Sequence, residues 1–489
     1  MITFKSVKID NIEAYEKDLK LAIPSFLVDD DTIQRLKVYL GIKCDEILVE
    51  YPYYDGDYLS TYYIHYAQKL KKYEKVCCRL HIMSKNEYYG YITIRPTEKG
   101  TRLGKSFIDP SIIIKKTAYL SLHKFKSHIV GNEMEIISFP WKSQQTDISV
   151  CAHTATWTVL RYFGNKFKNY SDTTIGEIVE RTKNDRGRKT PSTGLTPLQV
   201  SDLIQDYGFS PIILQNPKKA NYEFTDQVMS YIESGLPMIA FLNPIKHAIS
   251  ILGHGEIDLT VLDDEMIVNK LMDPEILAIP SGRLVKELYV MDDNCFPYQT
   301  MSFTLPDKNS ALTYCFSEIE YCVVPLYNRM QLAYDDLYAR FVSWMQEKEM
   351  NWERPCVCRI YITSATSLKR ETLISDSMNE KLQDIIGTLT LPKFVWCIDL
   401  ASFDNFKLGL TSGRIIVDTT SATLDENPWI LRHDLTQIDY VDIEKRCLGE
   451  YKIDSENMYE HVETSIDPYK MYRNNLVMIK PNDSEEQNG

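Results

Sequence analysis

The middle of the chain contains a run of apolar residues at helical spacing, directly after a cysteine. The apolar positions are three to four residues apart, at Ala152, Ala155, Val159 and Phe163. Gly164 can end this run. Ser149 suits the N-cap position, because its hydroxyl can accept a hydrogen bond from a free backbone N–H. The pattern therefore predicts a helix that places Cys151 in its first turn.

Shorter helices and strands follow. Helices are expected at 171–183, 196–207 and 226–234, and Thr196-Pro197 combines a cap with proline at the first helical position. Apolar runs and alternation predict strands at 238–242, from His247 to about Gly255, and at 287–291. The last of these strands runs directly into Asp292, Asp293 and Asn294. The sequence thus places a histidine at the start of one strand and an acidic pair at the end of another.

Mixed helical and strand patterns flank this segment on both sides. The expected helices are 32–40, 57–73, 329–348 and 371–386, and the expected strands are 76–82, 89–94, 118–122, 133–138, 358–363, 394–398 and 413–418. The tyrosines of 57–73 are expected to pack a half-buried helix rather than to form a binding face. We therefore predict an α/β domain at 1–135, a central domain at 136–326, a second α/β domain at 327–478 and a disordered polar tail at 479–489.

The composition excludes several classes of protein. The 489 residues carry a net charge of −13 at pH 7, whereas a nucleic-acid binder needs a basic surface. The eleven cysteines are odd in number and include no Cys-x-x-Cys pair, so neither a disulfide framework nor a zinc finger is expected. The chain opens without a signal-peptide pattern, and no apolar run reaches membrane-spanning length. We expect a cytoplasmic protein without a cofactor, a nucleic-acid partner or a membrane segment.

The cysteine, the histidine and the acidic pair together suit nucleophilic catalysis. Free N–H groups and partial positive charge at a helix N-terminus favour the thiolate of Cys151, which is the reactive form. The imidazole of His247 can accept the thiol proton, and a carboxylate or an amide can fix its orientation. Gln145 lies six residues before the cysteine, and its side-chain amide can help to bind an oxyanion.

His247 is the expected base among three nearby histidines. His254 is an odd number of positions away and would point to the other face of a regular strand. His153 comes two residues after Cys151, so it points about 200° away around the helix. We therefore predict that His247 pairs with Cys151.

Three consecutive residues compete to orient this histidine. Asp292 is the first polar position after the apolar strand, and Asp293 points to the opposite face of a regular strand. Asp293 is favoured instead if the strand extends by one residue or bulges. Asn294 offers an amide but lies in the expected turn. Asp292 is the first choice, and Asp293 remains the alternative.

This constellation resembles the papain-like cysteine peptidases, and more closely their small bacterial branch that includes the bacteriocin-leader peptidases. The resemblance rests on the spacing of Gln145 and Cys151, on His247-Ala248 in a strand that ends at 253–255, on the Gly235-Leu236-Pro237 turn, and on an aspartate after the last strand. It implies an α+β fold, in which a half with the nucleophile helix packs on an antiparallel sheet. The Cys-Gly-Ser-Cys-Trp and Asn-Ser-Trp-Gly signatures of plant papain are absent, so the resemblance does not define a specificity.

The resemblance implies hydrolysis of a peptide or isopeptide bond in a protein or peptide substrate, through a thioester on Cys151. Glutamine deamidation and acyl transfer pass through the same thioester and remain alternatives. A domain that binds peptides without catalysis is a further alternative. The plainest interpretation is that Cys151 is a small buried hydrophobic residue, as most lone cysteines at the start of an apolar helix are.

Overall fold

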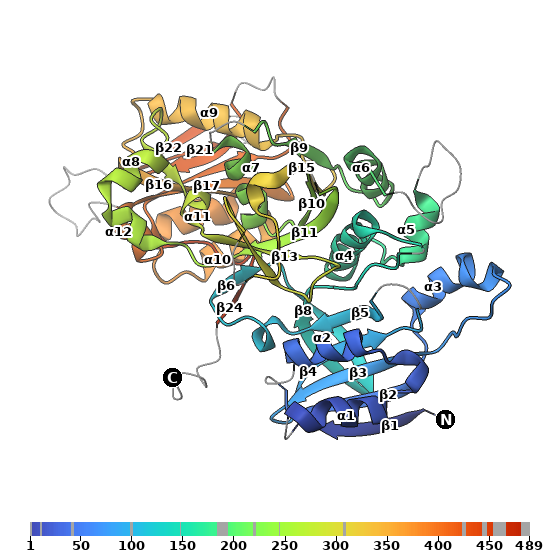
Figure 1. The fold of residues 1–489 in the computed structure, drawn as a ribbon. Coiled ribbons are helices and arrows are strands. Elements are labelled where there is room, and N and C mark those ends of the chain that lie inside the picture. The colour runs from blue at the N-terminus through green and yellow to red at the C-terminus, as the bar shows by residue number, and fades with distance from the viewer. Residues whose placement is uncertain are drawn as a thin grey trace.

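The computed structural model describes residues 2–9, 12–40, 44–97, 101–146, 148–182, 194–218, 222–243, 245–306, 310–422, 427–442, 447–452 and 466–480. Three large sheets, of five, eight and seven strands, form its framework. In Figure 1 the N-terminal sheet lies at the lower end, the C-terminal sheet lies at the upper left, and the central sheet lies between them with α4 beside it. The mixture of helices and strands agrees with the predicted α+β class. No described helix is long and apolar enough to cross a membrane.

The N-terminal sheet is antiparallel in the order β1-β2-β3-β4-β5. Its strands are Thr3–Lys8, Glu46–Tyr53, Cys77–Ser84, Glu87–Ile94 and Leu103–Ile108, and the helices of this part are α1 (Ile12–Ala22), α2 (Asp30–Leu40) and α3 (Gly56–Ile64). Lys85 and Asn86 have φ angles of 48° and 64°. Two left-handed residues in succession make the tight turn between β3 and β4, whose backbone matches the strand twist of a hairpin. The separate hairpin of β7 (His123–Ile129) and β8 (Asn132–Ser138) follows.

The central sheet has the order β14-β13-β11-β10-β15-β9, and β6 pairs with β11 and with β24. Its strands are β6 (Ala118–Leu120), β9 (Ile212–Gln215), β10 (Met238–Leu242), β11 (His247–His254), β13 (Glu287–Met291), β14 (Gln299–Ser302), β15 (Ile319–Val324) and β24 (Val477–Ile479). The helices of this part are α4 (Cys151–Lys166), α5 (Ile175–Arg181), α6 (Pro197–Asp206), α7 (Glu223–Glu233) and α8 (Glu265–Leu271). Helix α4 lies beside β11. This contact sets the position of Cys151 relative to His247.

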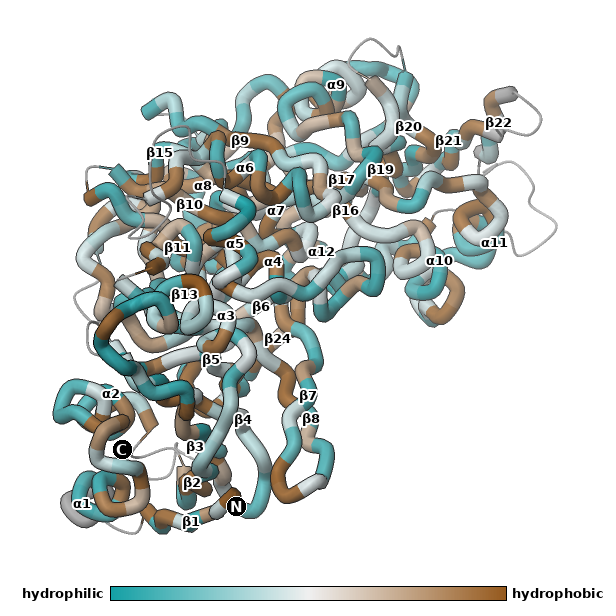
Figure 2. Tube along the Cα trace, turned by 90° about the vertical axis from the view of Figure 1, so that its right-hand side faces the viewer, coloured by the Kyte–Doolittle hydropathy of each residue, from teal (hydrophilic) through white to brown (hydrophobic). Residues whose placement is uncertain are grey.

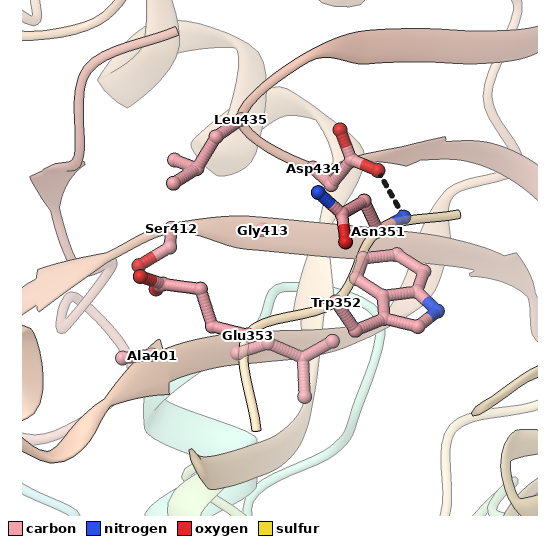
Figure 3. Close-up of a pocket in the computed structure, with 9 residues that line it drawn as sticks. Asn351, Trp352, Glu353, Ala401, Ser412, Gly413, Asp434 and Leu435 are labelled. Atoms are coloured by element: carbon pink, nitrogen blue, oxygen red, sulfur yellow. Dashed lines mark hydrogen bonds between the residues drawn. The ribbon is translucent and has the colours of Figure 1, made fainter. Parts of the chain in front are cut away.

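The C-terminal sheet has the order β12-β16-β17-β19-β20-β21-β22. Its strands are Ala278–Pro280, Cys356–Ser364, Phe394–Ser402, Gly413–Asp418, Trp429–His433, Gln437–Asp442 and Cys447–Lys452. The other elements of this part are α9 (Tyr334–Gln346), α10 (Ala365–Leu373), α11 (Glu380–Thr388), α12 (Phe403–Lys407), β18 (Leu410–Thr411) and β23 (Tyr469–Lys470). A cavity of about 10 Å³ lies against this sheet, where the backbone N–H of Asn351 donates to Asp434 over 2.6 Å (Figure 3). That volume suits a single water molecule and is too small for a peptide.

Strands cross both of the domain boundaries that we predicted. β6 precedes residue 135 and β24 follows residue 326, yet both join the central sheet. β12 lies between those boundaries and pairs in parallel with β16 of the C-terminal sheet. One apolar core runs from the N-terminal sheet into the C-terminal sheet, and Figure 2 shows hydrophobic stretches along strands at both ends of the molecule. The division into three domains therefore stays a prediction, within a molecule whose sheets exchange strands.

Several predicted elements differ from the structure at their ends. The helix expected at 57–73 ends at Ile64, and a 3₁₀ turn at Tyr66–Gln68 follows it. Its tyrosines do pack in the interior, since Tyr58, Tyr62 and Tyr66 are buried against Ile148. The helix expected at 371–386 is wrong as one element. It is instead the end of α10 and the whole of α11, because the Asn379 side chain accepts from two backbone N–H groups and starts a new helix.

The ends of α4 and of the chain also differ from the prediction. Val150, not Ser149, is the N-cap of α4, and it makes no side-chain capping bond. Gly164 does not end the helix, which continues to Lys166. The expected disordered tail was placed from residue 479, but Ile479 belongs to β24. Residues 481–489 lie outside the described part of the chain.

Candidate active site

Helix α4 carries Cys151 as its first residue, and a tight turn leads into it. The backbone N–H groups of Ile148 and Ser149 donate to the carbonyl of Gln145 over 2.8 and 2.9 Å, which folds the segment back on itself. Cys151 is partly exposed, whereas Ala152 and the following ten residues, except Arg161, are buried. Cys151 is therefore accessible at the start of a helix whose next two to three turns are largely buried in the core.

Two hydroxyl groups hold α4 against β11. Thr158 Oγ1 lies 2.6 Å from Ser250 Oγ, and Ser250 Oγ donates to the carbonyl of Ala155 over 3.1 Å. All three residues are buried, where a lost hydrogen bond costs more than at the surface. These bonds fix the helix of Cys151 on the strand that begins with His247.

The structure brings His247 together with both Cys151 and Asp292. Strands β11 and β13 are antiparallel, so the start of β11 lies beside the end of β13, where Asp292 follows. Nε2 of His247 lies 2.9 Å from Oδ1 of Asp292, and the Cys151 side chain is close enough to the imidazole to help raise the pKa of the histidine. The histidine therefore lies between a thiol and a carboxylate.

Each oxygen of Asp292 has a donor. Oδ1 accepts from His247 and from the backbone N–H of Asn294 over 2.8 Å, and Oδ2 accepts from the hydroxyl of Tyr314 over 2.6 Å. The indole N–H of Trp141 donates to the main-chain carbonyl of Asp292 over 2.9 Å. Tyr314 and Trp141 were not predicted from the sequence. Nothing in the local sequence marks them, because they reach Asp292 from segments 22 and 151 residues away.

The two residues after Asp292, which are Asp293 and Asn294, have different surroundings. Asp293 Oδ1 lies 3.9 Å from His247 Nε2, beyond hydrogen-bond distance, and neither of its buried carboxylate oxygens has a hydrogen-bond partner among the described residues. The side-chain amide of Asn294 lies 3.5 Å from the same nitrogen. Of the three candidates for orienting His247, Asp292 alone is within a normal hydrogen-bond distance.

The same neighbourhood sets the protonation of the histidine and of the carboxylates. Burial alone would lower the pKa of His247, but the hydrogen bonds and charges of Asp292 and Cys151 raise it to about 10. Burial tends to raise the pKa of Asp292, yet the bonds from His247 and Tyr314 hold it below its usual value. Burial raises the pKa of Asp293 to about 7, although the charge of His247 opposes the change. At neutral pH this geometry favours a charged imidazolium beside a charged Asp292.

Three of these residues could in principle hold a metal ion. His247, Asp292 and Asp293 each offer one ligand atom, and these atoms lie within 4.8 Å of one another. However, both oxygens of Asp292 already accept hydrogen bonds. Asp292 therefore suits orientation of the histidine better than ligation of a metal.

Gln145 lies in the interior, with its amide held from the N-terminal part of the chain. The Gln145 side chain donates from Nε2 to the hydroxyl of Tyr66 over 3.1 Å, and its Oε1 lies 3.2 Å from Oγ1 of Thr61. On the other side, Gln144 donates from its side chain to Asn294 over 2.9 Å. The segment before α4 is thus tied both to α3 and to the loop that carries Asp292.

The other two histidines have surroundings of their own. Nε2 of His254 lies 3.0 Å from a carboxylate oxygen of Glu233, and the other oxygen of Glu233 accepts from Arg359 over 2.6 Å. The ring of His254 stacks on Tyr119 at 5.2 Å. His153 is buried, and its Nδ1 has no partner among the described residues. His254 thus belongs to a buried ion cluster between the central and C-terminal sheets.

Comparison with known proteins agrees with a thiol enzyme in the central part. Residues 136–269 match the sequence profile of the Peptidase_C39 like family, which supports a papain-like cysteine peptidase. The match spans little more than a quarter of the chain. It includes Gln145, Cys151 and His247 but ends before Asp292. Neither the curated proteins nor the solved structures contain a match.

Proposed function

We propose that this protein is a papain-like cysteine peptidase that hydrolyses a peptide or isopeptide bond with Cys151, His247 and Asp292. The observation that carries the proposal is the position of His247, which lies 2.9 Å from Asp292 and close enough to Cys151 for the thiol to help raise its pKa. A lone buried cysteine would not need a histidine with a raised pKa, nor a buried carboxylate that orients it.

In the first half of the reaction, Cys151 gives its thiol proton to His247, and the thiolate sulfur attacks the carbonyl carbon of the substrate. The negative charge on the carbonyl oxygen is stabilised by the side-chain amide of Gln145 and by the free backbone N–H at the start of α4. The C–N bond breaks as the imidazolium of His247 donates its proton to the leaving amine. A thioester with Cys151 remains.

In the second half, His247 takes a proton from water, and the hydroxide that forms attacks the thioester carbonyl. The C–S bond breaks, the acid product leaves, and the proton returns to the Cys151–His247 pair. Asp292 keeps the imidazole in one orientation through both halves and stabilises its charged form. Tyr314 and Asn294 hold Asp292 in place.

The test compares new protein N-termini in a cell extract treated with the wild-type protein or with Cys151→Ala, in buffer with EDTA. New termini that depend on Cys151 would support peptide hydrolysis. Cys295→Ala is the matched control, because Cys295 is also partly exposed and lies near Asp292.

Other results would indicate a different reaction. Glutamine converted to glutamate without new termini would indicate a deamidase, and new amide links would indicate an acyl transferase. Equal activity of wild type and Cys151→Ala would contradict the proposal. Tight peptide binding without any Cys151-dependent product would identify a peptide-binding protein.

A further inference from the structure

The amide of Gln145 is held by two residues that lie far outside the segment that matches the peptidase family. Thr61 comes from α3 and Tyr66 from the 3₁₀ turn after it. Both contact the amide group, at 3.2 and 3.1 Å, and all three side chains are at most 3% exposed. The side chain of Gln145 therefore has a fixed orientation, and its position depends on the N-terminal part of the chain.

The backbone next to Gln145 is held from the same side. The ammonium group of Lys142 lies 2.6 Å from a carboxylate oxygen of Asp57 in α3, and both side chains are buried. The guanidinium of Arg95 donates to the carbonyls of Ser143 and Gln144 over 2.9 and 2.7 Å. Buried charged groups are costly to separate from their partners. The chain before α4 is thus clamped onto α3 and the N-terminal sheet.

The hydrogen-bonding capacity of the amide shows what this clamp leaves free. The hydroxyl of Thr61 also donates to the carbonyl of Tyr58 over 2.8 Å, and a hydroxyl has only one proton to donate. If the Thr61 hydroxyl donates its proton to the carbonyl of Tyr58, the Gln145 amide nitrogen faces and donates to Thr61, and its oxygen accepts from the Tyr66 hydroxyl. In the opposite orientation of the amide, its nitrogen donates to the Tyr66 hydroxyl. In both orientations, Thr61 and Tyr66 together use only one of the two N–H groups of Gln145.

We propose that Thr61 and Tyr66 are positioning residues that aim the remaining amide N–H of Gln145 at the substrate oxyanion, so that the N-terminal part of the chain completes the active site. This inference rests on the proposed function, and it adds that the segment 136–269 alone lacks an ordered side-chain donor to the oxyanion. In this proposal Thr61 and Tyr66 act through Gln145.

The experiment separates acylation of Cys151, which forms an oxyanion, from alkylation, which does not. Acylation is followed by nitrophenolate release from N-acetylglycine 4-nitrophenyl ester in single turnover, and alkylation is followed with iodoacetamide. We expect Gln145→Ala to slow acylation about 100-fold. Thr61→Val combined with Tyr66→Phe should slow it about tenfold, Thr61→Ser should restore most of the loss at position 61, and the alkylation rate should stay unchanged in every variant.

The matched control is Tyr58→Phe. It removes a hydroxyl from the same tyrosine cluster, but that hydroxyl donates to the carbonyl of Glu74 and not to Gln145. It should acylate at the wild-type rate. In a Gln145→Ala background, Thr61→Val should cause no further loss, because its effect passes through the missing amide.

Distinct results would overturn the two proposals. If Thr61→Val with Tyr66→Phe acylates as fast as Tyr58→Phe while Gln145→Ala is slow, the positioning role is wrong and the peptidase stands. If acylation and alkylation fall together in the double variant, these residues only maintain the fold, and the positioning role is again wrong. If Cys151→Ala hydrolyses the ester as fast as the wild type, the proposed function itself fails.

Discussion

Tyr314 donates a hydrogen bond of 2.6 Å to Oδ2 of Asp292. The other oxygen of this carboxylate faces His247, so the tyrosine and the histidine hold it from opposite ends. The ring of Tyr314 also lies edge-on to the imidazole, with the ring centres 6.2 Å apart. The orientation of His247 is therefore set by a chain of buried contacts that is complete before a substrate arrives.

Tyr314→Phe should move the acid limb of the pH–rate profile to higher pH. The hydroxyl stabilises the charged form of Asp292 and helps to hold its pKa down, so its loss raises that pKa. Turnover at neutral pH should fall by up to about tenfold, the value of one hydrogen bond. The measurement is kcat/KM against pH for both proteins, and an unmoved acid limb would show that Tyr314 has no influence on Asp292.

Cys151 should be the most readily alkylated of the ten cysteines whose side chains the structure describes. Cys295 is the informative comparison, because it is also partly exposed, yet burial raises its pKa to about 12. Brief iodoacetamide treatment of the folded protein at neutral pH, followed by peptide mapping, gives the order of reactivity. Faster labelling of Cys295 than of Cys151 would remove the support for an activated thiol.

His247→Ala and His254→Ala should fail in different ways. The first removes the proton carrier and should lower turnover by at least about 100-fold without a large change in the melting temperature. The second leaves the buried carboxylate of Glu233 with Arg359 alone and should cost about 1–3 kcal/mol of stability, with turnover largely kept. Thermal unfolding and steady-state kinetics on both variants measure these effects. A large loss of turnover in His254→Ala, with a loss of stability in His247→Ala, would make His254 the base instead.

Asp292→Asn should move the alkaline limb of activity to lower pH. His247 has a pKa raised to about 10, and after the opposing effect of burial the first cause of the rise is its bond to Asp292. An amide lacks the charge that stabilises the imidazolium, so the pKa of His247 falls and the thiolate–imidazolium pair is lost at lower pH. The loss in turnover should be smaller than for Cys151→Ala. An alkaline limb that moves only in Asp293→Asn would make Asp293 the orienting residue.

Asp293→Asn should make the free energy of unfolding less dependent on pH between acid and neutral conditions. The folded-state pKa of Asp293 is raised to about 7 from 3.8, so between these values the folded state binds more protons than the unfolded state. The free energy of unfolding of the wild type therefore falls as the pH rises through this window. The variant has no carboxylate at this position, so it should not show this fall in the free energy of unfolding, which is of the order of a few kcal/mol. Urea unfolding at pH 4 and pH 8 measures it, and parallel pH dependences for the two proteins would contradict it.

Local signals in the sequence were sufficient for several elements, including the strand that leads to Asp292. Strands β10, β13 and β19 have the predicted ends, because each is an apolar run bounded by turn residues. Thr196 and Gln199 form the capping box that starts α6, as the Thr-Pro pair indicated. The grouping of Cys151, His247 and Asp292 was expected from the chemistry that a thiol nucleophile requires and from the resemblance to papain-like peptidases.

Other features depend on contacts between distant segments, which a single sequence does not reveal. The helix expected at 57–73 stops at Ile64, and the rings of Tyr66 and Tyr73 instead pack 4.7 Å apart. The roles of Tyr314 and Thr61 arise from residues that are 22 and 84 positions from their partners. Spacing along one chain does not determine such pairs. The exchange of β6, β12 and β24 between parts of the chain has the same cause.

The pairing of β24 with β6 also has a consequence for folding during synthesis on the ribosome. β6 leaves the ribosome early, and one of its edges can join β11 as soon as residues 253–254 are made. Its other edge has no native partner until Val477–Ile479 have been synthesised. Throughout that interval the nascent chain presents an open strand edge, which is a site for pairing with other chains. The central sheet is therefore complete only after Val477–Ile479 have been synthesised.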